Sequence, residues 1–349
     1  MSTTPERQGA GETPQPEDWL RLVRMIHGYR VTQMLAVAAK LGIADFLADG
    51  PKSAAELAER TKTHTGALHR LLRALAGNGV FAEDDRGRYA LTPLGGLLRT
   101  DDPGSARALA IYNGDELVWR SWGSLLHSVA TGSAAFQRLY GMSIWEYRSQ
   151  HPEPDAVFND AMTALSNRRI GDVMATYDFS GIRTIVDVGG GHGALLAAIL
   201  RAHPGMRGIL FDQPHVAAGA HRLLETAGVA DRCRIVAGDF FEEVPTGGDA
   251  YIISKIIHDW GDERATAILR ACRRAMTAQA RLLLAEAVIP AGNGPHVGKL
   301  LDLHMLVMLE GGCERTEGEF RTLLAGAGFS LTRVLPANEE NSVIEARPV

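Results

Sequence analysis

Cysteine is scarce in this 349-residue sequence, and the three cysteines present suit neither a disulfide framework nor a zinc site. Cys233, Cys272 and Cys313 are far apart, odd in number and outside any CxxC spacing. Such usage is typical of a protein kept in a reducing compartment. The sequence also lacks a run of eighteen apolar residues, so no membrane-spanning helix is expected. We therefore expect a cytoplasmic protein with no membrane partner.

Blocks of like charge are missing as well. The formal net charge is −5 at pH 7, with 46% hydrophobic and 22% charged residues. This balance is ordinary for a globular protein and argues against broad binding to nucleic acid. The polar residues 1–18 contain several prolines and glycines and lack the basic start and apolar core of a signal peptide. We interpret them as a disordered leader.

A glycine-rich segment is the most informative feature of the sequence. The apolar run 185–188 is followed by four glycines within five positions, and then by the apolar run 194–200. This order predicts a strand, a tight turn and a helix, the first unit of a nucleotide-binding α/β sheet. Glycine permits a positive φ and close approach of a ligand. Because Gly189, Gly191 and Ala194 also fit a dinucleotide fingerprint, NAD(P), S-adenosylmethionine and a turn without ligand all stay open.

The next two predicted strand ends favour one of these ligands. The run 208–212 ends in Asp212, at about the distance expected for a carboxylate that binds ribose. A third strand runs into Gly238, Asp239 and Phe240, where the acid can face the adenine amine and the ring can pack on adenine. Each acid alone could be a helix N-cap. A dinucleotide fingerprint does not require the third strand end, so the ordered set favours S-adenosylmethionine.

Alternating strand and helix patterns continue from residue 184 to the end of the chain and predict a mainly parallel sheet. Further strands are predicted at 250–254, 281–286, 331–335 and 343–346, and helices at about 262–276, 300–309 and 317–327. We assign residues 176–349 to this domain.

Residues 19–102 have a winged helix-turn-helix pattern. The segment 31–43 has an apolar face too broad for an isolated surface helix, which indicates packing inside the protein or against a partner subunit. Ser53 and Glu56 form a capping-box pattern, and 65–76 predicts a second helix before a hairpin at 80–91. A DNA-binding domain should have a basic face. Residues 1–105 contain 13 Lys+Arg and 13 Asp+Glu, which favours a structural or dimerising role.

Bulky side chains are concentrated in residues 103–175, which we interpret as a helical connector. Such aromatic residues are either core or one wall of an apolar pocket. They are Trp119, Trp122, Phe136, Tyr140, Trp145, Tyr147 and Phe158.

His258 directly follows the fourth predicted strand, where open α/β sheets bind their ligands. A histidine in such a place is either catalytic or a satisfied polar residue. Asp262 is predicted as the N-cap of the following helix. The spacing of His258, Asp259 and Asp262 matches no common set of metal ligands, so we expect no metal site.

Over nearly its whole length the sequence resembles the caffeic acid O-methyltransferase-like family of S-adenosylmethionine-dependent enzymes, including bacterial members that act on antibiotics. Five motifs carry the resemblance: DVGGGHG at 187–193, GDFF at 238–241, HDW at 258–260, AEAVIP at 285–290 and GGCERT at 311–316. The resemblance implies an α/β fold with a Rossmann-like class I methyltransferase sheet domain. It also implies an N-terminal all-helical winged helix-turn-helix domain that forms a homodimer, and a small aromatic hydroxylated substrate.

The resemblance also implies residue roles. His258 corresponds to the general base, and Glu286 and Glu314 correspond to the glutamates on either side of its imidazole. Where relatives often have a lysine near adenine, this chain has Ser254, with the lysine displaced to Lys255. The adenine contact is assigned to Ser254, with Lys255 as the alternative.

Four further positions correspond to the wall of the substrate pocket, although all four could equally be core. They are Phe158, Met162, Met305 and Leu309. Two other functions stay open: a hydroxylase with a methyltransferase-like fold, and a winged-helix transcription regulator with a ligand-sensing domain.

Overall fold

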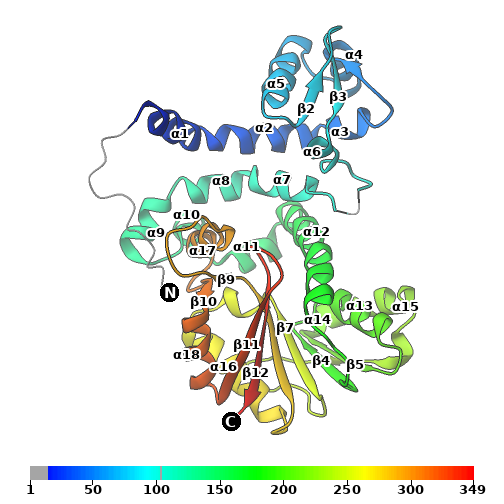
Figure 1. Cartoon of the computed structure of the whole chain (residues 1–349), viewed down its shortest axis with the longest axis vertical. Coiled ribbons are helices and arrows are strands. Elements are labelled where there is room, and N and C mark those ends of the chain that lie inside the picture. Colours follow the sequence, from blue (N-terminus) through cyan, green and yellow to red (C-terminus); the bar gives the residue numbers. More distant parts are fainter. Residues whose placement is uncertain (1–14, 103) are drawn as a thin grey trace, which may run out of the picture. The chain divides into compact units, whose positions relative to one another are not determined.

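A computed structural model describes residues 15–102 and 104–349, and the chain divides into two compact units, up to Asp115 and from Glu116 onward (Figure 1). Most of the predicted leader, residues 1–14, lies outside the described residues. Helix α1 (Pro16–Ile26) begins earlier than the predicted boundary at residue 19. Proline suits the first turn of a helix, and Gln15 and Asp18 form a capping box there.

The first unit contains the predicted winged helix. Its elements after α1 are α2 (Gly28–Lys40), α3 (Ile43–Phe46), β1 (Lys52–Ser53), α4 (Ala54–Thr61), α5 (Thr65–Gly77), β2 (Phe81–Glu83), β3 (Arg88–Leu91), α6 (Pro93–Gly96) and α7 (Arg107–Asn113). The predicted capping box is confirmed, because the Glu56 amide donates to Ser53 Oγ and the Ser53 amide donates to Glu56 Oε2. The unit is not all-helical, because the predicted hairpin and β1 form an antiparallel sheet in the order β1-β3-β2.

Several apolar side chains of the first two helices are exposed. Helix α1 has no buried residue, and α2 buries only Ala36, Ala38 and Ala39. The exposed large apolar residues here are Trp19, Leu20, Leu22, Met25, Ile26, Tyr29 and Val37.

The second unit begins with helices and continues with a seven-stranded sheet. The helices are α8 (Glu116–Trp122), α9 (Leu125–Thr131), α10 (Ala135–Tyr140), α11 (Ile144–Gln150) and the long α12 (Pro152–Thr176). The strands are β4 (Thr184–Val188), β5 (Arg207–Asp212), β6 (Cys233–Ala237), β7 (Ala250–Ser254), β8 (Arg281–Glu286), β11 (Phe329–Pro336) and β12 (Ser342–Pro348). All seven predicted strands are therefore confirmed.

The sheet order is β11-β12-β8-β7-β4-β5-β6. The five strands β4 to β8 are parallel, and β12 and β11 pair antiparallel at one end. The sheet is covered on both faces by helices: α13 (Ala194–Ala202), α14 (Pro214–Ala217) and α15 (Ala220–Thr226) on one side, and α16 (Asp262–Ala275) and α18 (Glu317–Gly326) on the other (Figure 1).

Alternate strand residues supply the cores on the two faces. Val186 and Val188 pack with the α16 and α18 side chains, whereas Ile185 packs with those of α13. This follows from the two-residue period of a strand. The central strands β4, β7 and β8 are buried on both faces, which explains their almost continuous apolar sequences.

The connections bring segments that are distant in sequence to the carboxyl edge of the sheet. The neighbouring strands β8, β7 and β4 end at Glu286, Ser254 and Val188. Strand β9 (Val288–Ile289) is followed by α17 (Val297–Met308) and then by the short strand β10 (Arg315–Thr316). β10 pairs parallel with β9. This pairing returns the GGCERT segment to the end of β8. Among the described residues, no helix is both long and apolar enough to cross a membrane.

Candidate active site

The glycine-rich loop leaves room for a ligand at Gly191. A Cβ atom there would meet no atom within 4 Å, and its φ of +60° favours glycine. Gly190 is different, because its Cβ would lie 2.5 Å from Leu210 Cδ1 and 2.6 Å from Asp187 Cγ. Gly190 therefore permits close packing of the loop, and Gly191 exposes its backbone at the edge of the sheet.

The predicted acid after the second strand is bonded to this loop. The Gly191 amide donates to Asp212 Oδ2 at 2.7 Å, and the Gln213 amide donates to Asp212 Oδ1 at 2.7 Å. The Gly238 amide donates to the Asp212 carbonyl at 3.0 Å, and a Cβ on Gly238 would lie 2.6 Å from the Phe211 ring. The first three strand ends are thus joined by hydrogen bonds to the Asp212 carboxylate and carbonyl.

Asp239 and Phe240 follow at the same edge. Asp239 Oδ1 accepts a hydrogen bond from the Phe241 amide at 2.8 Å, so this acid also stabilises a turn. The Phe240 ring lies 3.6 Å from the position of a Cβ on Gly189 and packs edge-on against Phe241. The predicted residues Gly189, Asp212 and Phe240 are therefore brought together.

Four buried polar atoms of the second unit have no hydrogen-bond partner, and all four lie near the carboxyl edge. They are Asp187 Oδ2, Ser254 Oγ, Glu286 Oε2 and Glu314 Oε2. Such atoms normally have partners in a folded protein, because leaving them unpaired costs free energy. Burial, with a contribution from Asp212, raises the pKa of the Asp187 carboxyl to about 7. The ammonium and ribose hydroxyl groups of S-adenosylmethionine are donors of the kind that these oxygens lack.

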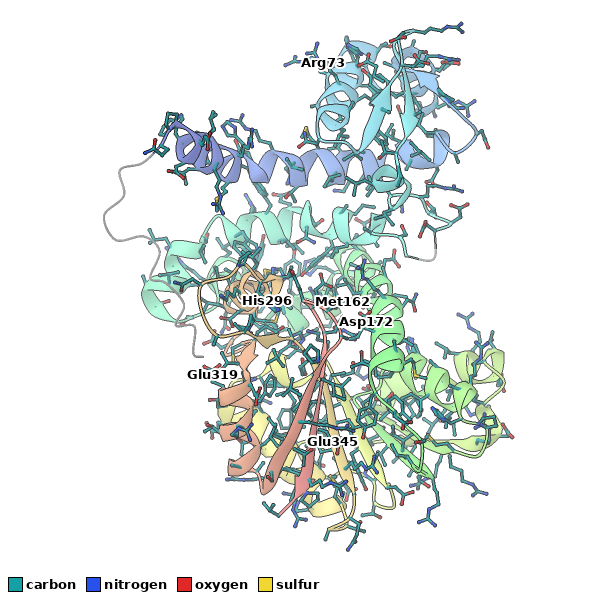
Figure 2. The ribbon with its side chains drawn as sticks, in the orientation of Figure 1. Arg73, Met162, Asp172, His296, Glu319 and Glu345 are labelled. Carbon is teal, nitrogen blue, oxygen red and sulfur yellow. The ribbon has the colours of Figure 1, made fainter. Side chains whose placement is uncertain are left out.

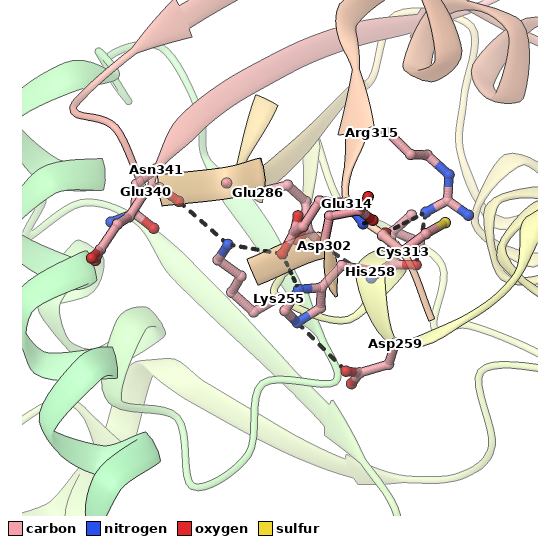
Figure 3. Close-up of polar contacts among 12 residues, drawn as sticks. Lys255, His258, Asp259, Glu286, Asp302, Cys313, Glu314, Arg315, Glu340 and Asn341 are labelled. Carbon is pink, nitrogen blue, oxygen red and sulfur yellow. Dashed lines mark hydrogen bonds and ion pairs between the residues drawn. The ribbon is translucent and has the colours of Figure 1, made fainter. Parts of the chain in front are cut away.

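His258 lies in a short helical turn, η2 (Ile257–Asp259), after β7. Its Nδ1 is 2.6 Å from Glu314 Oε1, and its Nε2 is 3.5 Å from Asp259 Oδ1 (Figure 3). Glu286 is placed differently, because its Oε1 accepts hydrogen bonds from the Ile256 and Ile257 amides at 3.1 and 3.0 Å. Glu314 therefore orients the imidazole directly, and Glu286 orients the backbone that carries it.

Opposing effects act on the protonation of this histidine. Burial disfavours the imidazolium, but the carboxylates of Glu286, Asp259 and Glu314 outweigh it, so the pKa of His258 is raised. Burial raises the pKa of Asp259 to about 6. For Glu314, the hydrogen bond and charge of His258 outweigh burial and lower its pKa. The cluster suits a group that accepts a proton.

Asp262 is not the N-cap of α16, as the sequence predicted. Gly261 occupies the N-cap position without a side-chain hydrogen bond, and Asp262 Oδ1 accepts from Arg315 at 2.7 and 3.0 Å. The buried Arg315 guanidinium also donates to the Ile257 and Trp260 carbonyls at 3.2 and 2.9 Å. Arg315 therefore fixes the HDW segment, a role that sequence reasoning missed although the residue stands in a quoted motif.

The predicted wall residues lie on two helices. Phe158 belongs to α12, as does Met162, which Figure 2 labels. Met305 is buried in α17, and Leu309 is buried at its end. The Arg148 guanidinium carbon lies 3.2 Å from the Phe158 ring centroid.

Two polar residues near these walls were not singled out from the sequence. Arg148 is buried, and its charge acts on Asp259. His304 accepts a hydrogen bond at Nδ1 from Trp122 Nε1 at 3.1 Å. Burial, assisted by the charges of Arg148 and His258, lowers the pKa of His304 to about 4. Both come from helices distant in sequence from the HDW motif.

The sequence analysis considered His258, Asp259 and Asp262 as metal ligands. The structure does not bring these three together as a ligand set, because the Asp262 carboxylate is paired with Arg315. Instead, possible ligand atoms of His258, Glu286 and Glu314 lie within 4.8 Å of one another. Hydrogen bonds to protein groups already use His258 Nδ1, Glu314 Oε1 and Glu286 Oε1. That the reaction needs no metal stays a prediction.

Comparisons with known proteins agree with this geometry. Residues 122–330 match an O-methyltransferase domain, and residues 23–101 match an O-methyltransferase dimerisation domain. The phenazine O-methyltransferase PhzM of Lysobacter antibioticus is 52% identical over 94% of this chain and 96% of its own length.

Relatives also include an N-methylating enzyme, the 8-amino-8-demethylriboflavin N,N-dimethyltransferase of Streptomyces davaonensis. It is 37% identical over 96% of this chain and 97% of its own length. Among solved structures, the calicheamicin-biosynthesis methyltransferase CalO1 with S-adenosylhomocysteine bound is 37% identical. It has a TM-score of 0.88 and covers 97% of this chain and 100% of its own. This chain belongs to the caffeic acid O-methyltransferase-like family and is a methyltransferase whose cofactor is S-adenosylmethionine.

Proposed function

We propose that this enzyme methylates a hydroxyl group of a small aromatic natural product and that His258 is the general base. The observation that carries the proposal is the buried His258–Glu314 pair, 2.6 Å apart at the carboxyl edge of the sheet. Because Glu314 takes Nδ1, the imidazole presents Nε2 as its other nitrogen. A proton acceptor beside the cofactor site is what transfer to a hydroxyl requires.

The proposed cofactor residues lie at successive strand ends. They are Gly189, Gly191, Asp212, Gly238, Asp239, Phe240 and Ser254. Asp212 is already oriented by the loop, so its carboxylate can accept ribose hydroxyls without reorganising. Ser254 Oγ is buried without a partner, whereas the Lys255 ammonium is directed to Glu314 and Glu340. This contrast favours Ser254 over Lys255 for the contact near adenine.

When bound, S-adenosylmethionine supplies an activated methyl group on its sulfonium sulfur. The protein must align the acceptor oxygen and take its proton. Alignment alone can lower the barrier by about 7–11 kcal/mol. Full proton transfer from an ordinary phenol to an ordinary imidazole before reaction costs about 4.8 kcal/mol. His258 Nε2 therefore takes the proton as the new C–O bond makes the oxygen acidic, and Glu314 stabilises the imidazolium.

We infer that Phe158, Met162, Met305 and Leu309 hold the flat acceptor. Methionine suits such a surface because its side chain adapts to different ring systems. The Lysobacter relative is named as a phenazine O-methyltransferase, which supports an aromatic acceptor.

We also infer a homodimer formed through the first unit, because its first two helices expose many apolar side chains and it matches the dimerisation domain. Sedimentation at micromolar concentration should give twice the monomer mass. A stable monomer there would contradict this inference.

A nitrogen acceptor is the second candidate, since one relative is named for methylating an amine. A neutral amine uses a free lone pair and needs no proton removed before attack. Matched pairs of phenols and anilines on phenyl, naphthyl and phenazine rings should therefore be incubated with the enzyme and the cofactor. Mass spectrometry should show the gain of one methylene unit on a phenol.

The His258→Ala variant separates the candidates. Turnover of a phenol should fall steeply, whereas turnover of an aniline should change little. Products formed only from anilines would overturn the proposal, and gain of one oxygen atom would indicate the hydroxylase alternative. Salt-sensitive binding to duplex DNA would instead support a regulator.

A further inference from the structure

Lys255, directly after β7, has an unusual backbone conformation. Its φ is +53°, and the other non-glycine residue with a positive φ in the described part of the chain is Lys62, at +55°. This region is unfavourable for residues with a Cβ and persists only when other contacts offset its cost. Lys62 is explained by its position, because it is the C-cap of α4. Lys255 ends no helix, so its contacts must explain it.

The left-handed turn directs the Lys255 side chain into the cluster around His258. Its Nζ lies 3.8 Å from Glu314 Oε1, the same oxygen that is 2.6 Å from His258 Nδ1 (Figure 3). The Lys255 side chain is 12% exposed and that of Glu314 is fully buried. Among the described residues, Lys255 and His258 are the two basic groups within ion-pair distance of Glu314.

The ammonium is held from its other side as well. Lys255 Nζ donates to the Glu340 carbonyl at 3.3 Å, in the turn between β11 and β12. That turn is tied to α12, because the side-chain amides of Asn338 and Asn341 donate to Asp172 Oδ2 at 2.7 and 2.9 Å. These contacts fix Lys255 beside the cluster and prevent it from turning to solvent.

The charges around His258 come from several elements. The acidic groups are Glu286 at the end of β8, Asp259 of η2, Glu314 before β10 and Asp302 of α17. The basic or neutral groups are Lys255, Arg148 of α11, His304 of α17 and Arg315 of β10. Three of the carboxylates favour a protonated imidazole, which could not act as a base. A fixed cation on the shared oxygen opposes them.

We propose that Lys255 is a positioning residue that shares Glu314 with His258 and thereby limits how strongly the surrounding carboxylates favour the protonated imidazole, so that more of the ring is able to accept a proton at a given pH. This inference rests on the proposed function of His258. The proposed role requires no contact between Lys255 and the acceptor. Lys255 acts through Glu314, because its positive charge offsets part of that carboxylate's charge and repels a proton on the nearby ring.

The test follows the titration of His258 by NMR in the full-length protein with isotope-labelled histidine. The His258 signal is identified by its loss in His258→Ala. In Lys255→Met the midpoint should rise by at least about half a pH unit, because a neighbouring positive charge is lost. Lys255→Arg should restore most of the original midpoint. Lys62→Met is the matched control, with nearly the same φ but in the first unit and away from the His258 cluster, and it should leave the His258 midpoint unchanged.

Activity provides a second readout with the acceptor found in the panel. In Lys255→Met the acidic limb of kcat/KM should move to higher pH by the same amount, with the value at high pH retained. If Lys255→Met does not fold, Lys255→Gly removes the charge while suiting the backbone, and should give the same shift.

An unchanged His258 midpoint in a folded Lys255 variant would overturn this inference. Failure of the proposed function is a different result, namely full turnover of a phenol by His258→Ala. The two failures are therefore distinguishable.

Discussion

The Gly191 amide and the Asp212 carboxylate are joined by a 2.7 Å hydrogen bond, so the glycine-rich loop and the second strand end form one preorganised unit. The Gln213 amide holds the other carboxylate oxygen. This arrangement fixes the acid before a ligand arrives, which reduces the entropy lost on binding.

Replacing Asp212 with alanine should weaken binding of S-adenosylhomocysteine by about 10- to 100-fold, because hydrogen bonds to a charged group contribute about 1.5–3 kcal/mol. Calorimetry measures the change, with the exposed Asp231→Ala as the control. NADPH should not bind either protein. Undiminished affinity in Asp212→Ala would remove this residue from the proposed cofactor set.

Alanine at Gly190 and at Gly191 should have different effects. Gly190→Ala places a Cβ 2.5 Å from Leu210 Cδ1, and should lower the free energy of unfolding by about 1–3 kcal/mol. Gly191→Ala meets no protein atom and should cost about 1–2 kcal/mol through its positive φ. Its methyl group should also obstruct the cofactor.

The matched control for Gly191 is Gly228, which has a φ of +68° and equally open surroundings. Urea unfolding should show similar losses for Gly191→Ala and Gly228→Ala. Only the first should weaken binding of S-adenosylhomocysteine. Equal binding by both variants would show that Gly191 does not face the cofactor.

The strand ends could be predicted because each lies in a continuous stretch of sequence. An apolar run followed by glycine or an acid marks Gly189, Asp212 and Asp239 without knowledge of the fold. His258 could be placed by the same rule. Local sequence is enough where a single strand and its following turn determine the position.

Contacts between distant segments could not be predicted in this way. Asp262 has the residue type and position of an N-cap, but its carboxylate pairs with Arg315, which β10 brings close. The contact of Lys255 with Glu314 depends on a backbone conformation that no residue pattern indicates. Arg148 and His304 reach the site from separate helices, so their proximity follows only from the packed fold.

Asp187 should make the ligand-free protein less stable as the pH rises. Burial raises its folded pKa to about 7, above the unfolded value, so the protonated form is favoured by folding. The contribution of the protonated Asp187 carboxyl to the free energy of unfolding is fully present below about pH 4 and is lost as the pH rises through about 7. In Asp187→Asn this pH-dependent loss, which amounts to at most about 4 kcal/mol in the parent protein, should be absent.

Urea unfolding between pH 4 and 7.5 measures the effect, with the exposed Asp85→Asn as the control. The difference between Asp187→Asn and the parent protein should grow as the pH rises. A constant difference across this range would mean that Asp187 does not titrate there.

His258→Ala should lower kcat for a phenolic acceptor by about 10² to 10⁴, the usual contribution of a positioned proton acceptor. Affinity for S-adenosylhomocysteine should change little, since His258 is not among the proposed cofactor residues, most of which lie at other strand ends. Glu314→Gln should cost less than His258→Ala but more than Glu286→Gln. Glu314 bonds directly to the imidazole, whereas Glu286 acts through the Ile256 and Ile257 amides.

The pH profile tests the same assignment. The carboxylates around His258 raise its pKa, so kcat/KM of the parent enzyme should fall as the pH drops through that pKa and the base becomes protonated. Glu314→Gln removes one of these carboxylates and should move the acidic limb to lower pH, while His258→Ala should abolish the limb. If the acidic limb persists unchanged in His258→Ala, another group is the base. Near-full turnover of a phenol by that variant would mean that alignment of the acceptor alone supports the reaction.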